Sequence, residues 1–276
     1  MDPGSTLRDP NATPSLSRRA VVLNADDFGF SPEVNAGIIH GHREGILGAT
    51  TLMANGTAFE DAVRLAKETP TLDVGCHLVL IQGDSVATGR PLPQSWGELL
   101  RAIAVGKLDV VTELSAQVER IIEAGLHPIH LDTHKHSHVH PVVFQQVLKV
   151  AKRYGLLYLR LPFDDGWVPG EPANWLYRRR LAKVGLRATN HFVGFRLTGA
   201  MDEAAMSAAL RKLLPGTTEL MCHPGYVGPD PLGFPTRLKE SRLRELEALT
   251  SPTVAQVIEE QKIFVANYRT LRGLAA

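Results

Sequence analysis

Two adjacent carboxylates follow the first apolar run of the sequence. Residues 20–23 (AVVL) form that run, Asp26 and Asp27 come just after it, and Gly29 then allows the chain to turn sharply. Neighbouring carboxylates beside an apolar segment are costly to bury unless a cation or a proton transfer employs them. The pair therefore indicates metal binding or acid–base chemistry. The simpler alternative is that these residues cap the helix that follows.

Histidines follow three further apolar runs, and residues 127–140 alone hold six of the chain's 11. The histidines that we single out are His77, His134, His136, His138 and His223. Two imidazoles with one carboxylate can bind a metal and leave positions open for water and substrate, which favours a catalytic metal over a structural one. Alternate side chains of an extended segment lie about 6–7 Å apart, so not every histidine of the cluster can bind one ion. We expect His136 and His138 to contact substrate or to support the ligands.

These assignments have plainer alternatives. His77 could be a hydrogen-bonded core residue, the cluster a solvated polar loop, and His223 an ordinary turn residue. If the runs are strands of one sheet, His223 could instead face the metal from the far side of the site and act as a general acid. Arg160 also ends an apolar run, where it could orient a carboxylate, bind substrate hydroxyls or stay exposed without a partner.

Short strand-like runs alternate with helical patterns from Arg18 onward, and at least seven strands can be counted. Parallel strands joined by crossover helices bring their carboxyl ends to one mouth, where the residues named above would meet. The fold class that we predict is α/β, a single TIM-like, somewhat irregular (β/α) barrel that forms one catalytic domain over residues 18–276. Residues 1–17 are rich in Pro, Ser, Asp and Asn, and we expect a disordered N-terminal tail there.

Capping residues predict two helix starts. Ser31 before Pro32 predicts a helix that begins at the proline, because Ser is a good N-cap and Pro suits the first helical position. Thr112 is expected to cap a second helix, whose end is marked by Gly125.

The composition excludes several classes of partner. The chain has 276 residues and a formal net charge of +1, so it lacks the cationic excess that nucleic acid or an anionic membrane requires. No apolar run has membrane-spanning length.

Cys76 and Cys222 are too few for a disulfide framework, so we expect a cytoplasmic protein. Each cysteine precedes a site histidine, and strand neighbours point to opposite faces, so both thiols should pack beneath the helices.

Four motifs together carry a resemblance to a known family. They are Asn-Ala-Asp-Asp-Phe-Gly at 24–29, Gly-Cys-His-Leu at 75–78, His-Leu-Asp-Thr-His-Lys-His at 130–136 and Met-Cys-His-Pro at 221–224. In type and order they resemble the YdjC-like carbohydrate deacetylases, which include chitooligosaccharide deacetylases and hopanoid-associated members. The resemblance runs from about residue 19 to about residue 270.

The resemblance implies a metal-dependent N-deacetylase on a (β/α) barrel, with an N-acetylated carbohydrate as substrate. It implies Asp27, His77 and His134 as metal ligands, Asp26 as catalytic base and His223 as acid. The residue types alone do not decide which Asp plays which role. One divalent ion is expected, Mg²⁺ or Zn²⁺, and the donor set also accepts Mn²⁺.

The expected reaction is amide hydrolysis by metal-activated water, in which Asp26 takes a proton and His223 donates one to the leaving amine. A different metallohydrolase stays open, because His136 and His138 form a His-x-His pair similar to that of amidohydrolase or phosphoesterase barrels. Those enzymes usually carry the pair on the first strand. A non-catalytic metal- or sugar-binding module also stays open, although a binder has no need for a second carboxylate or for His223. The sequence leaves the sugar and the oligomeric state open, a homodimer included.

Overall fold

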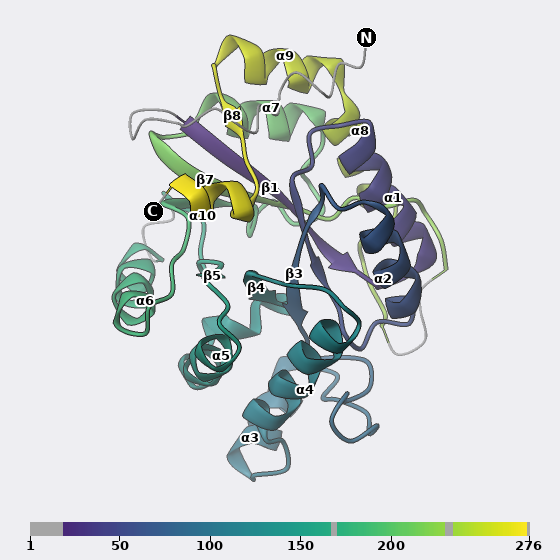
Figure 1. Ribbon diagram of the computed structural model, residues 1–276, viewed down its shortest axis with the longest axis vertical. Helices are drawn as coiled ribbons and strands as arrows, with labels where there is room; N and C mark the ends of the chain where they lie inside the picture. The colour runs from purple at the N-terminus through teal and green to yellow at the C-terminus, as the bar shows by residue number, and fades with distance from the viewer. Residues whose placement is uncertain (1–18, 167–169, 230–233, 275–276) are drawn as a thin grey trace.

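The computed structural model describes residues 19–166, 170–229 and 234–274. The expected N-terminal tail, residues 1–17, lies outside the described residues. Within them the chain folds as alternating strands and helices, with the helices packed around one sheet (Figure 1).

All strand pairings in the sheet are parallel. The strands are β1 (Arg19–Phe28), β2 (Ala49–Leu52), β3 (Asp73–Leu78), β4 (His130–Thr133), β5 (Tyr158–Leu159), β6 (His191–Val193), β7 (Gly216–Cys222) and β8 (Phe264–Val265). Their order is β5-β4-β3-β2-β1-β7-β6, and β8 pairs with β1 at Ala20 and Val21. Because β1 lies between β2 and β7, it brings its carboxyl end to the middle of the sheet.

The α/β class is confirmed, but the expected closed barrel is wrong. Within the described ranges no strand ladder joins β5 to β6, the two ends of the sheet order, so the sheet is an open half-barrel. One bridge between Tyr158 and Arg187 and a 2.9 Å hydrogen bond from Asp165 N to Phe192 O cross the gap. β5 and β6 span only two and three residues, and each forms its ladder on the other side, β5 with β4 and β6 with β7.

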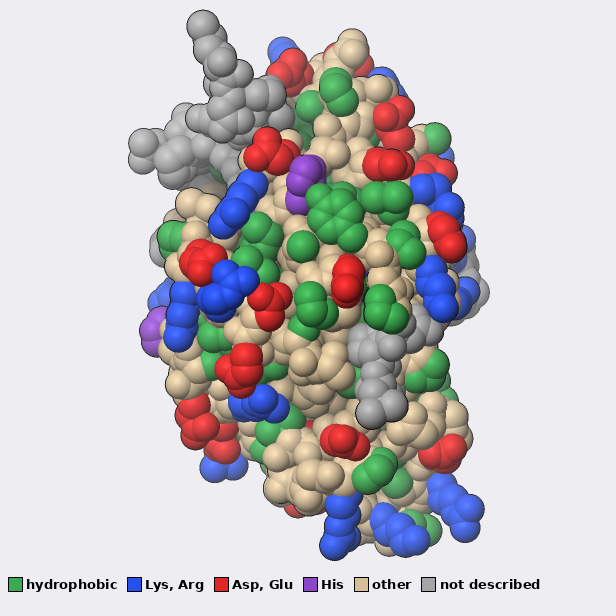
Figure 2. Space-filling model, turned by 90° about the vertical axis from the view of Figure 1, so that its right-hand side faces the viewer, with side chains coloured by type: hydrophobic (Ala, Val, Ile, Leu, Met, Phe, Trp, Pro, Cys, Tyr) green, Lys and Arg blue, Asp and Glu red, His purple; other side chains and the backbone are tan. Residues whose placement is uncertain are grey.

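Most of the helices supply the outer layer of the fold, whereas the last, at Tyr268–Leu274, packs against the cluster that contains Val22 (Figure 1). The helices are α1 (Pro32–Arg43), α2 (Phe59–Glu68), α3 (Trp96–Ala104), α4 (Val110–Glu123), α5 (Pro141–Arg153), α6 (Glu171–Lys183), α7 (Glu203–Arg211), α8 (Glu240–Thr250), α9 (Pro252–Glu260) and α10 (Tyr268–Leu274), with a 3₁₀ helix, η1, at His134–Val139. Among the described residues, none of these helices is long and apolar enough to cross a membrane. Figure 2 shows basic and acidic side chains interspersed over one face, as the near-neutral charge leads one to expect.

Alternate residues of β1 face two separate apolar clusters. Val21 and Leu23 belong to the main core, which the helices cover, whereas Val22 packs with Tyr158 and Tyr268 in a smaller cluster. Because strand side chains alternate, Asn24 and Asp26 lie on the same face as Val22, inside the curl of the sheet. The inner face of β1 therefore begins with the apolar Val22 and becomes polar at Asn24 and Asp26, toward its carboxyl end.

One of the two predicted helix starts is correct. Ser31 caps α1, because its Oγ accepts a hydrogen bond from Val34 N at 3.3 Å. The prediction at Thr112 is wrong, since α4 begins three residues earlier: Asp109 is its N-cap, and Oδ1 accepts from Thr112 N at 3.2 Å. Asp and Thr are both good caps, and the sequence offered both.

Candidate active site

Asp26 and Asp27 reach the same cavity although they are neighbours on a strand, where side chains normally point to opposite faces. The pairing of β1 with β2 shifts register between Ala25 and Phe28, and Asp27 has a left-handed φ of 68°. This irregularity turns Asp27 toward the side that Asp26 already faces. A non-glycine residue rarely adopts such a φ, so the surrounding contacts must hold it there.

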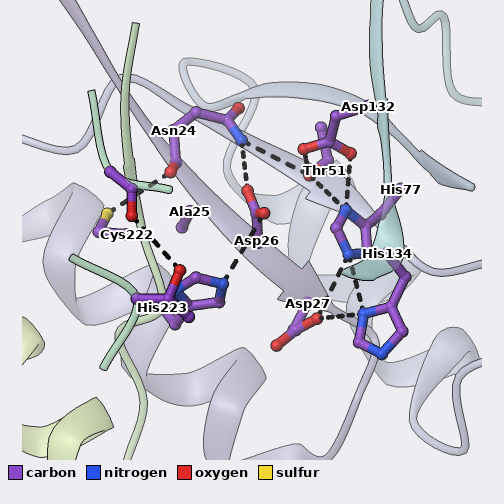
Figure 3. A network of polar contacts seen from close by, with 12 residues as sticks. Asn24, Ala25, Asp26, Asp27, Thr51, His77, Asp132, His134, Cys222 and His223 are labelled. Carbon is purple, nitrogen blue, oxygen red and sulfur yellow. Dashed lines mark hydrogen bonds and ion pairs between the residues drawn. The ribbon is translucent and has the colours of Figure 1, made fainter. Parts of the chain in front are cut away.

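Three donor atoms converge at this end of the sheet (Figure 3). Asp27 Oδ1 lies 3.4 Å from His77 Nε2 and 3.2 Å from His134 Nδ1, and the two ring nitrogens are 3.2 Å apart. Two ligands that are each about 2.0–2.2 Å from a tetrahedral ion lie about 3.3–3.6 Å apart. Asp27 Oδ1 is also buried without a well-formed hydrogen bond. The three residues therefore fit a divalent ion, and they form a candidate metal-binding cluster.

His77 is fixed by a carboxylate behind it. Its Nδ1 donates to Asp132 Oδ1 at 2.6 Å, and Thr51 Oγ1 donates to Asp132 Oδ2 at 3.1 Å. Burial alone would lower the pKa of His77, but the Asp132 carboxylate raises it to about 10, so an ion bound at Nε2 would have to displace the proton from that nitrogen. The contact holds Nδ1 protonated and directs Nε2 at the other two donors, which is the usual support for a metal-binding histidine. Burial lowers the pKa of His134, so that ring is neutral and able to bind a metal.

Arg160 lies at the centre of a buried cluster of carboxylates rather than in the cavity. Its guanidinium bonds both oxygens of Asp26 at 2.6 Å, Asp132 Oδ2 at 2.7 Å and Glu219 Oε1 at 2.7 Å. Arg160 is only 2% exposed and is not among the residues that line the cavity. Of the roles expected for it, orientation of carboxylates fits this geometry. Burial opposes ionisation of Asp26, yet Arg160 holds the pKa of that carboxyl well below its usual range.

His223 approaches Asp26 from β7. Its Nε2 lies 3.8 Å from Asp26 Oδ2, while its backbone N–H donates to Glu245 Oε2 at 2.5 Å. Burial lowers the pKa of His223 to about 4, although the nearby Asp26 and Asp27 oppose the shift. The ring is therefore neutral at pH 7 and must gain a proton before it can act as an acid.

A cavity of about 610 Å³ opens above these side chains. Of the residues expected from the sequence, it is lined by Asp26, Asp27, His77, His134, His136 and His223. A second cavity, of about 770 Å³, lies between residues 85–94, α3 and α4 and contains none of them. The residues that could do chemistry thus share one cavity.

His136 and His138, the two other histidines expected at the site, lie in different surroundings. His136 lines the cavity with its ring 4.7 Å from that of Phe195, whereas His138 is fully buried and hydrogen-bonds Thr133 Oγ1 through Nδ1 at 2.6 Å. Lys135 and His136 both have left-handed φ angles, 52° and 51°, so the segment does not alternate as an extended chain would. His138 therefore supports η1 from inside the fold, away from the cavity.

Residues 20–260 match the family described as YdjC-like protein. The chain belongs to this YdjC-like family. A carbohydrate deacetylase of Geobacillus stearothermophilus is 36% identical to it over 255 residues, which cover 91% of this chain and 97% of that protein. A carbohydrate deacetylase of Brevibacillus brevis is 35% identical over 260 residues, which cover 91% and 99%. A crystal structure from Enterococcus faecalis V583, described as a candidate cellobiose-phosphate cleavage protein, superimposes with a TM-score of 0.77 at 25% identity and covers 92% of this chain and 99% of that one.

Two charged residues of this YdjC-like site come from α8 and were missed by the sequence analysis. Arg242 Nη2 bonds Asp27 Oδ2 at 2.6 Å, and Glu245 accepts the backbone N–H of His223. Burial raises the pKa of Glu245 to about 7, so its carboxyl is partly protonated near neutral pH. Neither residue follows an apolar run, so nothing in the sequence distinguished them from the solvated charges of a surface helix.

Both cysteines are free and buried. Cys76 and Cys222 belong to the main core, and burial raises the pKa of both thiols. Figure 3 shows the Cys222 sulfur turned toward Asn24, whose carbonyl oxygen lies 3.5 Å away. The cysteines therefore contribute packing and stay out of the cluster of metal-binding donors.

Proposed function

We propose that this protein is a metal-dependent hydrolase that removes the acetyl group from an N-acetylated sugar or oligosaccharide and releases acetate. The observation that carries the proposal is the arrangement at the end of β1: Asp27, His77 and His134 can hold a metal, and His223 faces Asp26 in the same cavity. Asp26, His77 and Asp132 form a second possible metal-binding group, but Arg160 bonds the carboxylates of both aspartates, so we assign the ion to the first group. The names of the relatives that match most of the chain supply the class of substrate.

Asp27, His77 and His134 would hold the ion. Two nitrogens and one oxygen suit Zn²⁺, and they also accept Mg²⁺ or Mn²⁺ when water fills the remaining positions. When bound, the ion would lower the pKa of water and polarise the amide carbonyl. Because Arg242 occupies Oδ2 of Asp27, only Oδ1 faces the two imidazoles, and the protein donors leave room for water and substrate.

Asp26 is the proton acceptor in this proposal. Arg160 keeps it ionised at neutral pH. Asp26 Oδ1 accepts from both Arg160 and Asn24 Nδ2, whereas Oδ2, among the described residues, accepts only from Arg160 and keeps a second lone pair for a proton. The same ion pair makes Asp26 a weak base, so a proton that it takes from the attacking water is easily passed on. The neutral His223 ring, 3.8 Å from Asp26 Oδ2, can receive that proton and donate it to the departing amine.

The competing metallohydrolase assignment has weaker support. It needs His136 and His138 to act as a pair, but His138 does not line the cavity and its Nδ1 hydrogen-bonds Thr133 Oγ1. A binding module would have no use for His223 and Asp26 facing each other beside the metal-binding cluster. We also propose a cytoplasmic location, because two free buried thiols suit a reducing compartment; cell fractionation would test it.

The decisive experiment measures released acetate. Protein loaded in turn with Zn²⁺, Mg²⁺ or Mn²⁺ is incubated with a panel of N-acetylated mono- and disaccharides, beside protein treated with a chelator. We expect acetate from at least one sugar, with activity lost on chelation and restored by added metal. If protein with one equivalent of bound ion releases no acetate from any sugar of the panel, the proposal is wrong.

A further inference from the structure

The outer part of the cavity is built by segments that follow β3 and β7, not by the strand ends. Gln82 Nε2 donates to Pro235 O at 3.0 Å and so joins two segments that are far apart in the chain. Beside this contact a Cβ on Gly83 would lie 2.2 Å from Cζ of Phe234, so the two segments approach as closely as a glycine allows. The mouth of the cavity is therefore a fixed structure.

Trp96 lines this cavity and is the first residue of α3. This helix follows β3 in the chain and lies beside α4 (Figure 1). Ser95 fixes the start of the helix, because its Oγ accepts from Glu98 N at 3.3 Å. The Trp96 side chain is attached one residue after this cap. The backbone position that carries the indole is therefore fixed at the edge of the cavity.

Trp96 differs from the other aromatic residues of the cavity in what it contacts. Phe30 is 4% exposed and packs against Phe234, and Phe195 lies against His136. Trp96 is 36% exposed, and no ring or cation contact to it is found among the described residues. An indole of this kind at the mouth of a cavity offers a flat apolar face to a ligand.

The chemistry of the mouth fits a pyranose ring. One face of such a ring carries C–H groups that stack on an aromatic plane, while its hydroxyls at the edge need hydrogen-bond partners. Gln82, Thr236 and Arg237 line the same cavity and supply such partners. Aromatic and polar groups together thus offer both contacts that a sugar requires.

Exposure separates this region from the reacting groups. Asp26, Asp27 and His77 are each 2% exposed, against 36% for Trp96. The acetamide must reach the buried donors, so the ring that carries it fills the deep part of the cavity. A ring stacked on Trp96 would then be the next ring of the chain.

We propose that Trp96 is the platform for the sugar ring adjacent to the acetylated one, so that the substrate is an oligosaccharide of two or more rings rather than a monosaccharide. This inference rests on the deacetylase function proposed above. It assigns a specificity-determining role to α3, which contributes no residue to the metal-binding cluster.

The test compares the Trp96→Ala and Trp96→Phe variants with wild type. Acetate release is measured with N-acetylglucosamine and with its β-1,4-linked disaccharide, and the ratio of kcat/KM for the two sugars is the readout. Trp96→Ala should lower the ratio of disaccharide to monosaccharide by about tenfold, mainly through KM, and Trp96→Phe by less, because an aromatic contact of this kind is modest in strength. Trp175→Ala is the control, since Trp175 is 58% exposed on α6 and does not line the cavity.

A binding measurement separates this inference from the proposed reaction. The fully deacetylated disaccharide is titrated calorimetrically onto wild type, Trp96→Ala and Trp175→Ala. Weaker binding by Trp96→Ala alone supports the platform even if no variant releases acetate, a result that would remove only the deacetylase proposal. Equal disaccharide binding by the three proteins, or an unchanged ratio of kcat/KM in Trp96→Ala, overturns the platform and leaves the deacetylase proposal intact.

Discussion

Replacing Arg160 by Met should destabilise the protein strongly at neutral pH. The guanidinium contacts three buried carboxylates, of Asp26, Asp132 and Glu219, at 2.6–2.7 Å. Removing one partner of a buried ion pair costs about 3–5 kcal/mol, because it leaves the other charge without compensation. With three carboxylates around one cation we expect about 4 kcal/mol, which for a chain of this size lowers Tm by roughly 8–16 °C.

The loss of stability caused by Arg160→Met should depend on pH. In wild type the folded-state pKa of Asp26 lies below its unfolded value, so the ion pair contributes stability above about pH 4 that is lost as the pH falls through the folded pKa. Without Arg160, burial alone would raise the pKa of Asp26, and the variant would gain stability on protonation. The loss caused by Arg160→Met should therefore be greatest near pH 8 and smaller near pH 5.

Urea unfolding at pH 5 and pH 8, followed by circular dichroism, measures both effects. Arg160→Lys keeps a positive charge but loses the bidentate contact, so it should lie between wild type and Arg160→Met. Arg211→Met is the control, because Arg211 pairs with Glu260 at 3.1 Å on the surface, where such a pair contributes less than about 1 kcal/mol. A loss of less than about 1 kcal/mol in Arg160→Met, or the same loss at both pH values, would refute the reasoning.

Three further predictions concern the metal and the thiols. His77→Ala should lose the single equivalent of divalent ion, and elemental analysis that still finds one tightly held equivalent would show the ligand set to be wrong. Asp26→Asn should keep the ion and lose turnover, whereas Asp27→Asn should weaken both; equal metal loss in the two variants would contradict the roles proposed. Replacing Cys76 and Cys222 together by Ala should lower the free energy of unfolding by about 1 kcal/mol for each residue and leave metal content and turnover near wild type. A folded double variant without metal or activity would instead indicate a thiolate ligand or nucleophile.

The meeting of the Asp26–Asp27 pair, His77 and the histidine cluster could be predicted because each follows an apolar run, whereas the choice of Asp27 and His134 as ligands came from the family resemblance. Parallel strands bring their carboxyl ends to one edge of a sheet, so residues that are distant in sequence meet there. The structure indeed places Asp27, His77 and His134 within 3.2–3.4 Å of each other. The register shift and the left-handed φ at Asp27, which make the meeting possible, leave no trace in the pattern of apolar residues.

The charged residues around the site were harder to predict. Glu219 did carry a signal, since an acid at the head of the apolar run Leu220–Cys222 needs a partner once the strand is buried, and Arg160 is that partner. Arg242 and Glu245 carried none, because α8 is rich in charged residues and only tertiary packing decides which of them turn inward. Closure of the barrel could not be predicted either, since it depends on whether β5 and β6 pair. With two and three residues, these strands are too short to show an alternation of polar and apolar residues in the sequence.

The proposed roles of the two adjacent carboxylates follow from their arginine partners. Arg160 bonds both oxygens of Asp26, which neutralises that carboxylate and keeps it from competing for the ion. Arg242 bonds only Oδ2 of Asp27, so Oδ1 remains free to face the two imidazoles. Two carboxylates one residue apart would otherwise repel each other and chelate a cation together. One arginine for each lets both stay ionised in a buried site, and the difference between a two-oxygen and a one-oxygen contact supports proton transfer by Asp26 and metal binding by Asp27.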